Sequence, residues 1–147
     1  MTERLALVVD DTPANRDFLE RLLMTAKFTV RTADSGQAAI KALKDVETLA
    51  LAVVDMQLPD VNGLQLTVEL RERYPNAVIV VATMYDERSL MERSFQKGCN
   101  IFLVKPHGFM ELFKRLTTIN LDEMCTQTNM VIDQYGPRIL TPTLKSV

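Results

Sequence analysis

The sequence has little of the chemistry on which many metal and redox proteins depend. It has no tryptophan, one histidine (His107) and two cysteines (Cys99 and Cys125) in 147 residues. The cysteines lack the CxxC spacing of zinc and redox sites, and a single histidine has no partner histidine for a metal. Cys99 begins an apolar run and is expected to be a buried thiol. This use of cysteine is typical of a reducing compartment, so we expect a cytoplasmic protein.

Long apolar runs and an excess of positive charge are also missing. No apolar run approaches the roughly 20 residues needed to cross a bilayer. The first run, Leu5–Val9, is too short and too close to acidic residues for a signal peptide. The net charge is −2 and the sequence has no basic stripe, which argues against direct binding to nucleic acid or to a membrane surface.

What the sequence does have is a regular alternation of short apolar runs and helical patterns. Apolar residues make up 47% of the chain, an ordinary fraction for one globular domain. Five βα units predict an α/β, flavodoxin-like (βα)5 fold, a doubly wound parallel sheet of strand order 2-1-3-4-5. The expected strands are 4–10, 29–33 (an edge strand), 49–55, 77–82 and 99–104, and the expected helices begin near Thr12, Ser35, Gly63, Asp86 and His107.

Polar side chains close four of the five expected strands. Asp10 and Asp11 close the first, Asp55 the third, Thr83 the fourth and Lys105 the fifth. Ligands bind at this edge of an open α/β sheet. Carboxylates gathered there repel one another unless a cation lies between them. The pattern therefore predicts a divalent-metal site, for Mg²⁺ or Mn²⁺, beside a reactive aspartate.

The expected metal ligands are all oxygens. Asp11 and Asp55 are predicted to bind the metal directly, and Asp10 directly or through a water molecule. The backbone carbonyl of Gln57, in the loop after Asp55, is predicted to complete the set.

Asp55 is also the predicted nucleophile. A carboxylate that holds a metal with one oxygen can attack a phosphoryl group with the other. Lys105 would neutralise the phosphoryl oxygens, and the Thr83 hydroxyl would donate a hydrogen bond to one of them. The product would be an aspartyl phosphate, which adds negative charge in one step.

These residues together resemble a known family. The order Asp-Asp, Asp, Thr and Lys-Pro at strand ends, with the loop Leu58-Pro-Asp-Val-Asn-Gly63, resembles the receiver domain of bacterial response regulators over residues 4–119. The resemblance implies that a sensor histidine kinase or histidine phosphotransfer protein phosphorylates Asp55 in a Mg²⁺-dependent reaction. It also implies a signalling module that catalyses only its own phosphorylation and dephosphorylation, not an enzyme with other substrates.

The resemblance also implies a switch. In the family, an aromatic side chain on the fifth strand rotates when the threonine moves toward the phosphate, which gives these roles to Phe102 and Thr83. The output face would then be formed by residues 86–97, 99–104 and 109–119. A homodimer through this face is one expected assembly.

Three positions near the site are expected to control access and phosphoryl lifetime. Met84 stands where the family usually has a small residue, and a long flexible side chain there would narrow access. Gln57 and Tyr85 occupy two positions that modulate self-dephosphorylation in the family. We therefore expect a lifetime that differs from that of fast chemotaxis-type receivers.

The last part of the chain does not continue the βα alternation, so we divide the chain into a receiver domain, 1–119, and a C-terminal extension, 120–147. An apolar stripe predicts a helix over 120–135, and Gly136-Pro137 ends it before a flexible tail. The stripe consists of Leu121, Met124, Thr128, Val131 and Tyr135. This helix would fold back on its own domain or serve as a linker, a dimer contact or a docking segment.

Other functions remain open from the sequence. A degenerate receiver, with Met84 blocking phosphorylation, would act as an interaction adaptor. A magnesium phosphohydrolase usually has a second acid two residues after the nucleophile, where this chain has Gln57. A flavin-binding module needs a phosphate cradle after the first strand, where this chain has acidic residues. Each site residue alone has an ordinary structural interpretation, and only their joint order favours a phosphorylation site.

Overall fold

The computed structural model describes residues 4–105, 108–118, 129–133 and 136–140. The elements within these ranges are β1 (Leu5–Val9), α1 (Pro13–Thr25), β2 (Thr29–Ala33), α2 (Gly36–Ala42), β3 (Leu51–Asp55), α3 (Gly63–Arg73), β4 (Val78–Thr83), α4 (Arg88–Gln96), β5 (Ile101–Val104), α5 (Gly108–Thr118), β6 (Met130–Asp133) and β7 (Gly136–Ile139). Among the described helices, none has the length and apolar character needed to cross a membrane.

One sheet contains all the described strands, in the order β2-β1-β3-β4-β5-β6-β7. The strands from β1 to β6 are parallel to their neighbours, and β7 is antiparallel to β6. The first five strands have the order 2-1-3-4-5, so the predicted flavodoxin-like fold is confirmed, and β2 lies at the edge as expected. The winding direction reverses between β1 and β3, and in open α/β sheets ligands bind at such a reversal.

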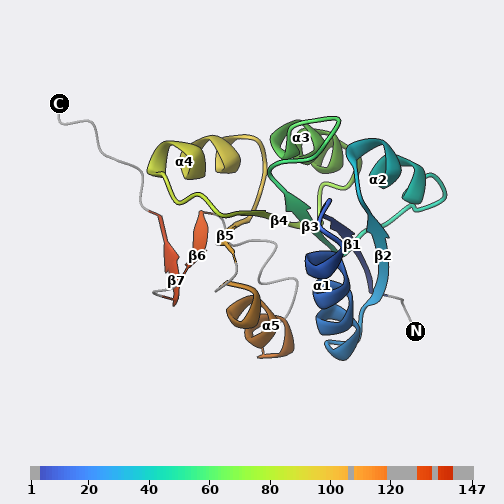
Figure 1. Ribbon diagram of the computed structural model, residues 1–147, viewed down its shortest axis with the longest axis horizontal. Coiled ribbons are helices and arrows are strands. Elements are labelled where there is room, and N and C mark those ends of the chain that lie inside the picture. The colour runs from blue at the N-terminus through green and yellow to red at the C-terminus, as the bar shows by residue number, and fades with distance from the viewer. Residues whose placement is uncertain (1–3, 106–107, 119–128, 134–135, 141–147) are drawn as a thin grey trace.

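Helices cover both faces of the sheet. Figure 1 shows α2, α3 and α4 on one face and α1 and α5 on the other. Successive residues of a strand point to opposite faces. In β3, Ala52 and Val54 belong to the core under α2–α4, whereas Leu51 and Val53 belong to the core under α1 and α5. Apolar residues in succession are therefore required, because this parallel strand is buried on both faces.

The first turns of α1 and α2 are closed in different ways. Ser35 is the N-cap residue of α2, so this helix begins where it was predicted to, and the Ser35 hydroxyl accepts a hydrogen bond from the Ala38 amide at 3.1 Å. Thr12 is the N-cap residue of α1, but its side chain makes no capping hydrogen bond. Instead, the Thr12 amide donates to Asp10 Oδ1 at 2.8 Å. The turn after β1 is therefore closed by Asp10, which fixes the position of that carboxylate.

The helix predicted over 120–135 is wrong where it can be compared with the structure. Met130–Asp133 is a strand that pairs in parallel with β5. Met130, Val131 and Ile132 are buried in succession, as in a strand covered on both faces. The 3-4 spacing through Val131 misled the prediction, because short apolar runs fit both periods.

The rest of the C-terminal prediction is only partly covered. Residues 119–128, 134–135 and 141–147 lie outside the described ranges, and β7 occupies the start of the segment predicted to be flexible. The division into domains at residue 119 stays a prediction.

Candidate functional site

The ends of four neighbouring strands bring the predicted site residues together. β1 and β3 are in register, so Asp10, the residue after β1, lies opposite Asp55 at the end of β3. β4 and β5 are in register at Thr83, the last residue of β4, and Lys105 directly follows β5. Four parallel strands thus present their polar ends at one edge of the sheet, as the sequence predicted.

Lys105 lies between two carboxylates. Its Nζ is 3.2 Å from Asp10 Oδ2 and 3.3 Å from Asp55 Oδ1. The exposed fractions of the Lys105, Asp10 and Asp55 side chains are only 10%, 2% and 9%. Two buried carboxylates without a cation would be costly. The ammonium therefore compensates for the negative charge that the strand ends bring together.

The pKa of Asp55 reflects opposing influences. Burial raises the pKa of this carboxyl, the Lys105 ammonium lowers it and the Asp10 carboxylate raises it, and the net direction is upward. Within the described part of the chain, Oδ1 receives both contacts of the Asp55 carboxylate, from Lys105 Nζ and from the Gln57 amide at 3.2 Å. Oδ2 is therefore the oxygen left for a ligand.

The acidic residues fit a divalent cation. Asp10, Asp11 and Asp55 each offer a carboxylate oxygen, and these oxygens lie within 4.8 Å of one another. Asp10 and Asp55 are buried and Asp11 is exposed, so the group is open to solvent on one side. Hard oxygens with room for water suit Mg²⁺, which keeps several water ligands. The Gln57 backbone lies beside the Asp55 carboxylate, because its amide donates to Asp55 Oδ1.

The site opens into a cavity of about 300 Å³. Seven of the predicted residues line it: Asp11, Asp55, Gln57, Thr83, Met84, Tyr85 and Lys105. The sequence patterns missed two further lining residues, Thr12 and Asn15. They follow the acidic pair in the sequence and precede the apolar residues of α1, and their spacing matched no pattern that indicates a binding site. Met84 is 70% exposed, so most of its side chain extends into solvent.

Two predicted residues lie outside the cavity lining. Asp10 is buried and does not line the cavity. Phe102 is fully buried in the core that includes Met91 of α4. Thr83 lies on β4, the strand next to Phe102, and its hydroxyl oxygen accepts a hydrogen bond from the Tyr85 amide at 3.2 Å. The two predicted switch residues therefore belong to adjacent strands, one at the cavity and one in the core.

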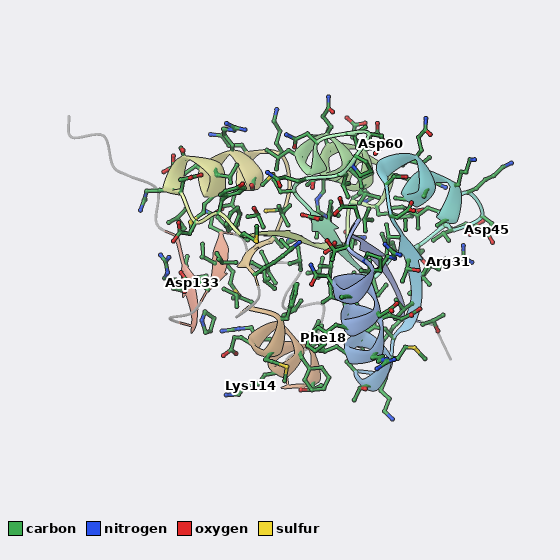
Figure 2. All side chains as sticks on the ribbon, in the orientation of Figure 1. Phe18, Arg31, Asp45, Asp60, Lys114 and Asp133 are labelled. Carbon is green, nitrogen blue, oxygen red and sulfur yellow. The ribbon has the colours of Figure 1, made fainter. Side chains whose placement is uncertain are left out.

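Asp60 has a structural role that the sequence patterns did not indicate. Its two carboxylate oxygens accept hydrogen bonds from the Gly36 and Gln37 amides, at 2.8 and 2.9 Å, at the start of α2. Figure 2 labels Asp60 where the loop before α3 reaches α2. The sequence indicated a turn here but not its partner, because the partner lies more than twenty residues away.

Gly63 has a similar hidden role. A Cβ atom at this position would overlap the Asp55 carbonyl oxygen and lie 2.8 Å from Met56 Cα. The Gly63 amide also donates to the Met56 carbonyl at 2.8 Å. Only glycine lets α3 begin this close to the end of β3, so the glycine helps to place the Asp55 backbone.

Comparison with known proteins gives an independent result. The protein-family model of the response regulator receiver domain matches residues 6–117. The heme response regulator HssR of Staphylococcus aureus is 32% identical over 134 residues, which cover 87% of this chain and 59% of that protein. The match thus spans about three fifths of the length of this curated relative and 29% of the length of a second curated relative.

Known structures agree with this result. A CheY-like receiver domain protein from Methanospirillum hungatei is 24% identical, with a TM-score of 0.73 over 84% of this chain and 97% of that chain, which shows a common fold. A response regulator from Burkholderia pseudomallei is 27% identical, with a TM-score of 0.70 over 82% of this chain and 70% of that chain. Its structure contains a phosphorylated aspartic acid, a calcium ion and citrate.

Proposed function

Because the chain belongs to the response-regulator receiver family, we propose that it is the phosphoryl-accepting module of a two-component or phosphorelay system, with Asp55 as the acceptor. The position of Asp55 carries the proposal: Lys105 and the Gln57 amide hold one oxygen of a carboxylate that lines the cavity. Receiver domains act with histidine kinases or histidine phosphotransfer proteins, and such a protein is the proposed donor.

The proposed transfer uses the chain's own residues. An oxygen of Asp55 forms a bond to phosphorus while the bond from phosphorus to the donor nitrogen breaks, and the electron pair leaves with the donor imidazole. The Lys105 ammonium moves from the carboxylates toward the new phosphoryl oxygens, and the Thr83 hydroxyl donates to one of them. Asp55 and Thr83 are buried and the Lys105 side chain is only 10% exposed, which supports this assignment, since electrostatic stabilisation is strongest where water is excluded.

Receiver domains hold a divalent cation in an acidic pocket, and here we assign it to Asp10, Asp11, Asp55 and the Gln57 carbonyl. Mg²⁺ bound there would offset charge on the phosphoryl oxygens during transfer. The spacing of the three carboxylates supports the assignment, because the oxygens can converge on one ion.

The proposed output follows from Thr83. Movement of the Thr83 hydroxyl toward the phosphoryl group would leave more room for Phe102 in its buried position, and would so favour one arrangement of the face formed by α4, β5 and α5. Gln57, Met84 and Tyr85, which border the cavity, would control entry of the water that removes the phosphate.

The test is phosphorylation of the full chain by acetyl phosphate in Mg²⁺, followed by intact mass spectrometry. The wild type should gain one phosphoryl group, and chelation of the metal should prevent the gain. Asp55→Asn should show no gain, whereas Asp17→Asn, a change at an exposed aspartate of α1, should behave as the wild type. A wild type that gains no phosphate from several donors would favour the adaptor function instead.

A further inference from the structure

A strand of the chain itself covers the edge of β5. Phe102 of β5 is the register partner of Val131 of β6, with Ile101 paired to Met130 and Leu103 to Ile132. Neighbouring strands lie about 4.8 Å apart, and partners in adjacent parallel strands point to the same face. Phe102 and Val131 are both fully buried and belong to the same core. Val131 therefore closes one side of the space around Phe102.

The second strand of the hairpin holds Val131 in place. Leu140, just after β7, is buried in the same core, and its amide donates to the Asn129 carbonyl at 2.7 Å. Arg138 is the register partner of Val131, and its guanidinium donates to the buried Asp133 carboxylate at 2.7 Å. Figure 2 labels Asp133 on this hairpin. Backbone hydrogen bonds, an ion pair and apolar packing thus fix the hairpin along the edge of β5.

The opposite face of β6 packs elsewhere. Met130 and Ile132 belong to the other core, with residues of α1 and α5. A Cβ atom on Gly108 would meet the Leu103 side chain and lie 3.0 Å from the Ile132 carbonyl oxygen, so the start of α5 rests directly against β6. Val131 on one face of β6 therefore packs in the core of Phe102, whereas Met130 and Ile132 on the other face pack in the core of α5.

We propose that Val131 is a positioning residue for the phosphorylation switch, acting through Phe102, and that the functional receiver extends to residue 140. This inference rests on the function proposed above. Protein interiors have little free volume, so a buried aromatic ring can change its packing only if its neighbours allow it. Val131 occupies that neighbouring volume and favours the buried position of Phe102. The proposed phosphoryl group at Asp55 favours the same buried position of Phe102. Because Val131 and the phosphoryl group favour one conformation, the phosphoryl group is bound more tightly when Val131 is present.

The test compares substitutions on the two faces of β6 in the full chain. The affinity for beryllofluoride, a phosphoryl mimic, is measured in Mg²⁺ by ¹⁹F NMR for the wild type, Val131→Ala and Met130→Ala. Val131→Ala should weaken the affinity roughly 2- to 30-fold, the range in which substitutions alter coupling between sites. Met130→Ala removes a side chain that is also buried but lies on the other face of β6, and should leave the affinity unchanged.

Thermal unfolding shows whether each variant is folded, and both should be less stable than the wild type. If either fails to fold, Val131→Ile and Met130→Leu replace the pair. The extra methyl group of isoleucine crowds the space that Phe102 occupies and should again weaken the affinity, whereas Met130→Leu should leave it unchanged. Equal affinities for the two variants, whether lowered or unchanged, would overturn the role of Val131. A wild type that does not bind beryllofluoride, or an Asp55→Asn variant that binds it equally well, would instead overturn the proposed function.

Discussion

At the scale of single residues, the site places charge where burial makes charge costly. Asp10 and Asp55 are buried carboxylates, and Lys105 Nζ lies 3.2 Å from the first and 3.3 Å from the second. The strand ends therefore hold the proposed phosphoryl acceptor at the expense of stability, a compromise that functional sites often show. Replacing the Asp55 carboxylate should reveal that cost.

Asp55→Asn should make the folded protein more stable at pH 7 in metal-free buffer. The folded pKa of Asp55 is raised above its ordinary value of 3.8, so the folded state favours the protonated form. Ionisation therefore destabilises the fold as pH rises through the folded pKa. The advantage of the variant should shrink as pH falls toward 3.8, because the wild-type carboxyl then becomes protonated.

Urea unfolding of both proteins at pH 7 and near pH 4 measures this effect, with Asp17→Asn as the exposed control. An Asp55→Asn variant that is less stable than the wild type at pH 7 would contradict the assigned direction of the pKa shift.

At the scale of elements, the loop between β3 and α3 links the site to two helices. Gly63 lets α3 start against the Asp55 backbone, and the Asp60 carboxylate closes the start of α2. An isolated bridge between Gln57 and Asn62 closes the loop on itself. The loop that carries the proposed carbonyl ligand is therefore anchored at both ends and at its tip.

Gly63→Ala should destabilise the protein by about 1–3 kcal/mol, the usual cost of overpacking. The added methyl group would meet the backbone of β3, which cannot move without displacing Asp55. The matched change, Gly36→Ala, meets only side-chain atoms of Val61 and Asp60 and no backbone of a strand, and should cost less. Chemical denaturation measures both losses. A larger loss for Gly36→Ala than for Gly63→Ala would contradict the argument.

Asp60→Ala should lower stability at neutral pH, because two amides at the start of α2 lose their acceptor. Hydrogen bonds from the Gln37 and Gly36 amides hold the pKa of Asp60 below its ordinary value of 3.8. The stabilisation is therefore present above that value and is lost as pH falls through the lower folded pKa.

Thermal unfolding from pH 7 to pH 3 should show the difference between Asp60→Ala and the wild type narrowing at the acid end. Glu72→Ala, at an exposed position of α3, is the control and should show no comparable narrowing. A constant difference across this range would mean that the ionised carboxylate is not what stabilises α2.

At the scale of the whole molecule, the sheet has two strands, β6 and β7, beyond β5, which would be the edge strand of a five-stranded receiver. β5 lies between β4 and β6, and β7 is the outer strand. Pro137 and the Asp133–Arg138 ion pair belong to this outer hairpin, and proline and paired charge are features that protect sheet edges from unwanted pairing. A homodimer through α4, β5 and α5 stays a prediction, and any such interface would have to accommodate β6.

A chain that ends at residue 119 should be less stable than one that ends at residue 140. The shorter chain exposes the β5 edge and loses the burial of Met130, Val131, Ile132 and Leu140. Burial of side chains of this size contributes about 1.5–3 kcal/mol each, before the cost of ordering the chain. Urea unfolding should show a lower midpoint and a smaller m-value for the shorter chain. Coincident unfolding curves would mean that the hairpin adds no stability.

The order of elements and the placement of the predicted site residues were readable from local patterns. Apolar runs set the five strands, and parallel strands must share one carboxyl edge, so Asp10, Asp55 and Lys105 had to converge. Turn-forming residues likewise indicated the loop after β3, and the apolar run after Cys99 indicated that its thiol is buried, as the structure shows.

Only the tertiary structure decided the partners of residues that act over long separations. The contact of Asp60 with α2, the need for glycine at Gly63 and the pairing of β6 with β5 all depend on elements far apart in sequence. Val131 shows the reason. A short apolar run such as 130–132 is compatible with a helix or a strand, and pairing with the edge of β5 as a strand buries these residues on both faces. Local periodicity determines which segments must be buried, but the surface that buries them exists only once the sheet has formed.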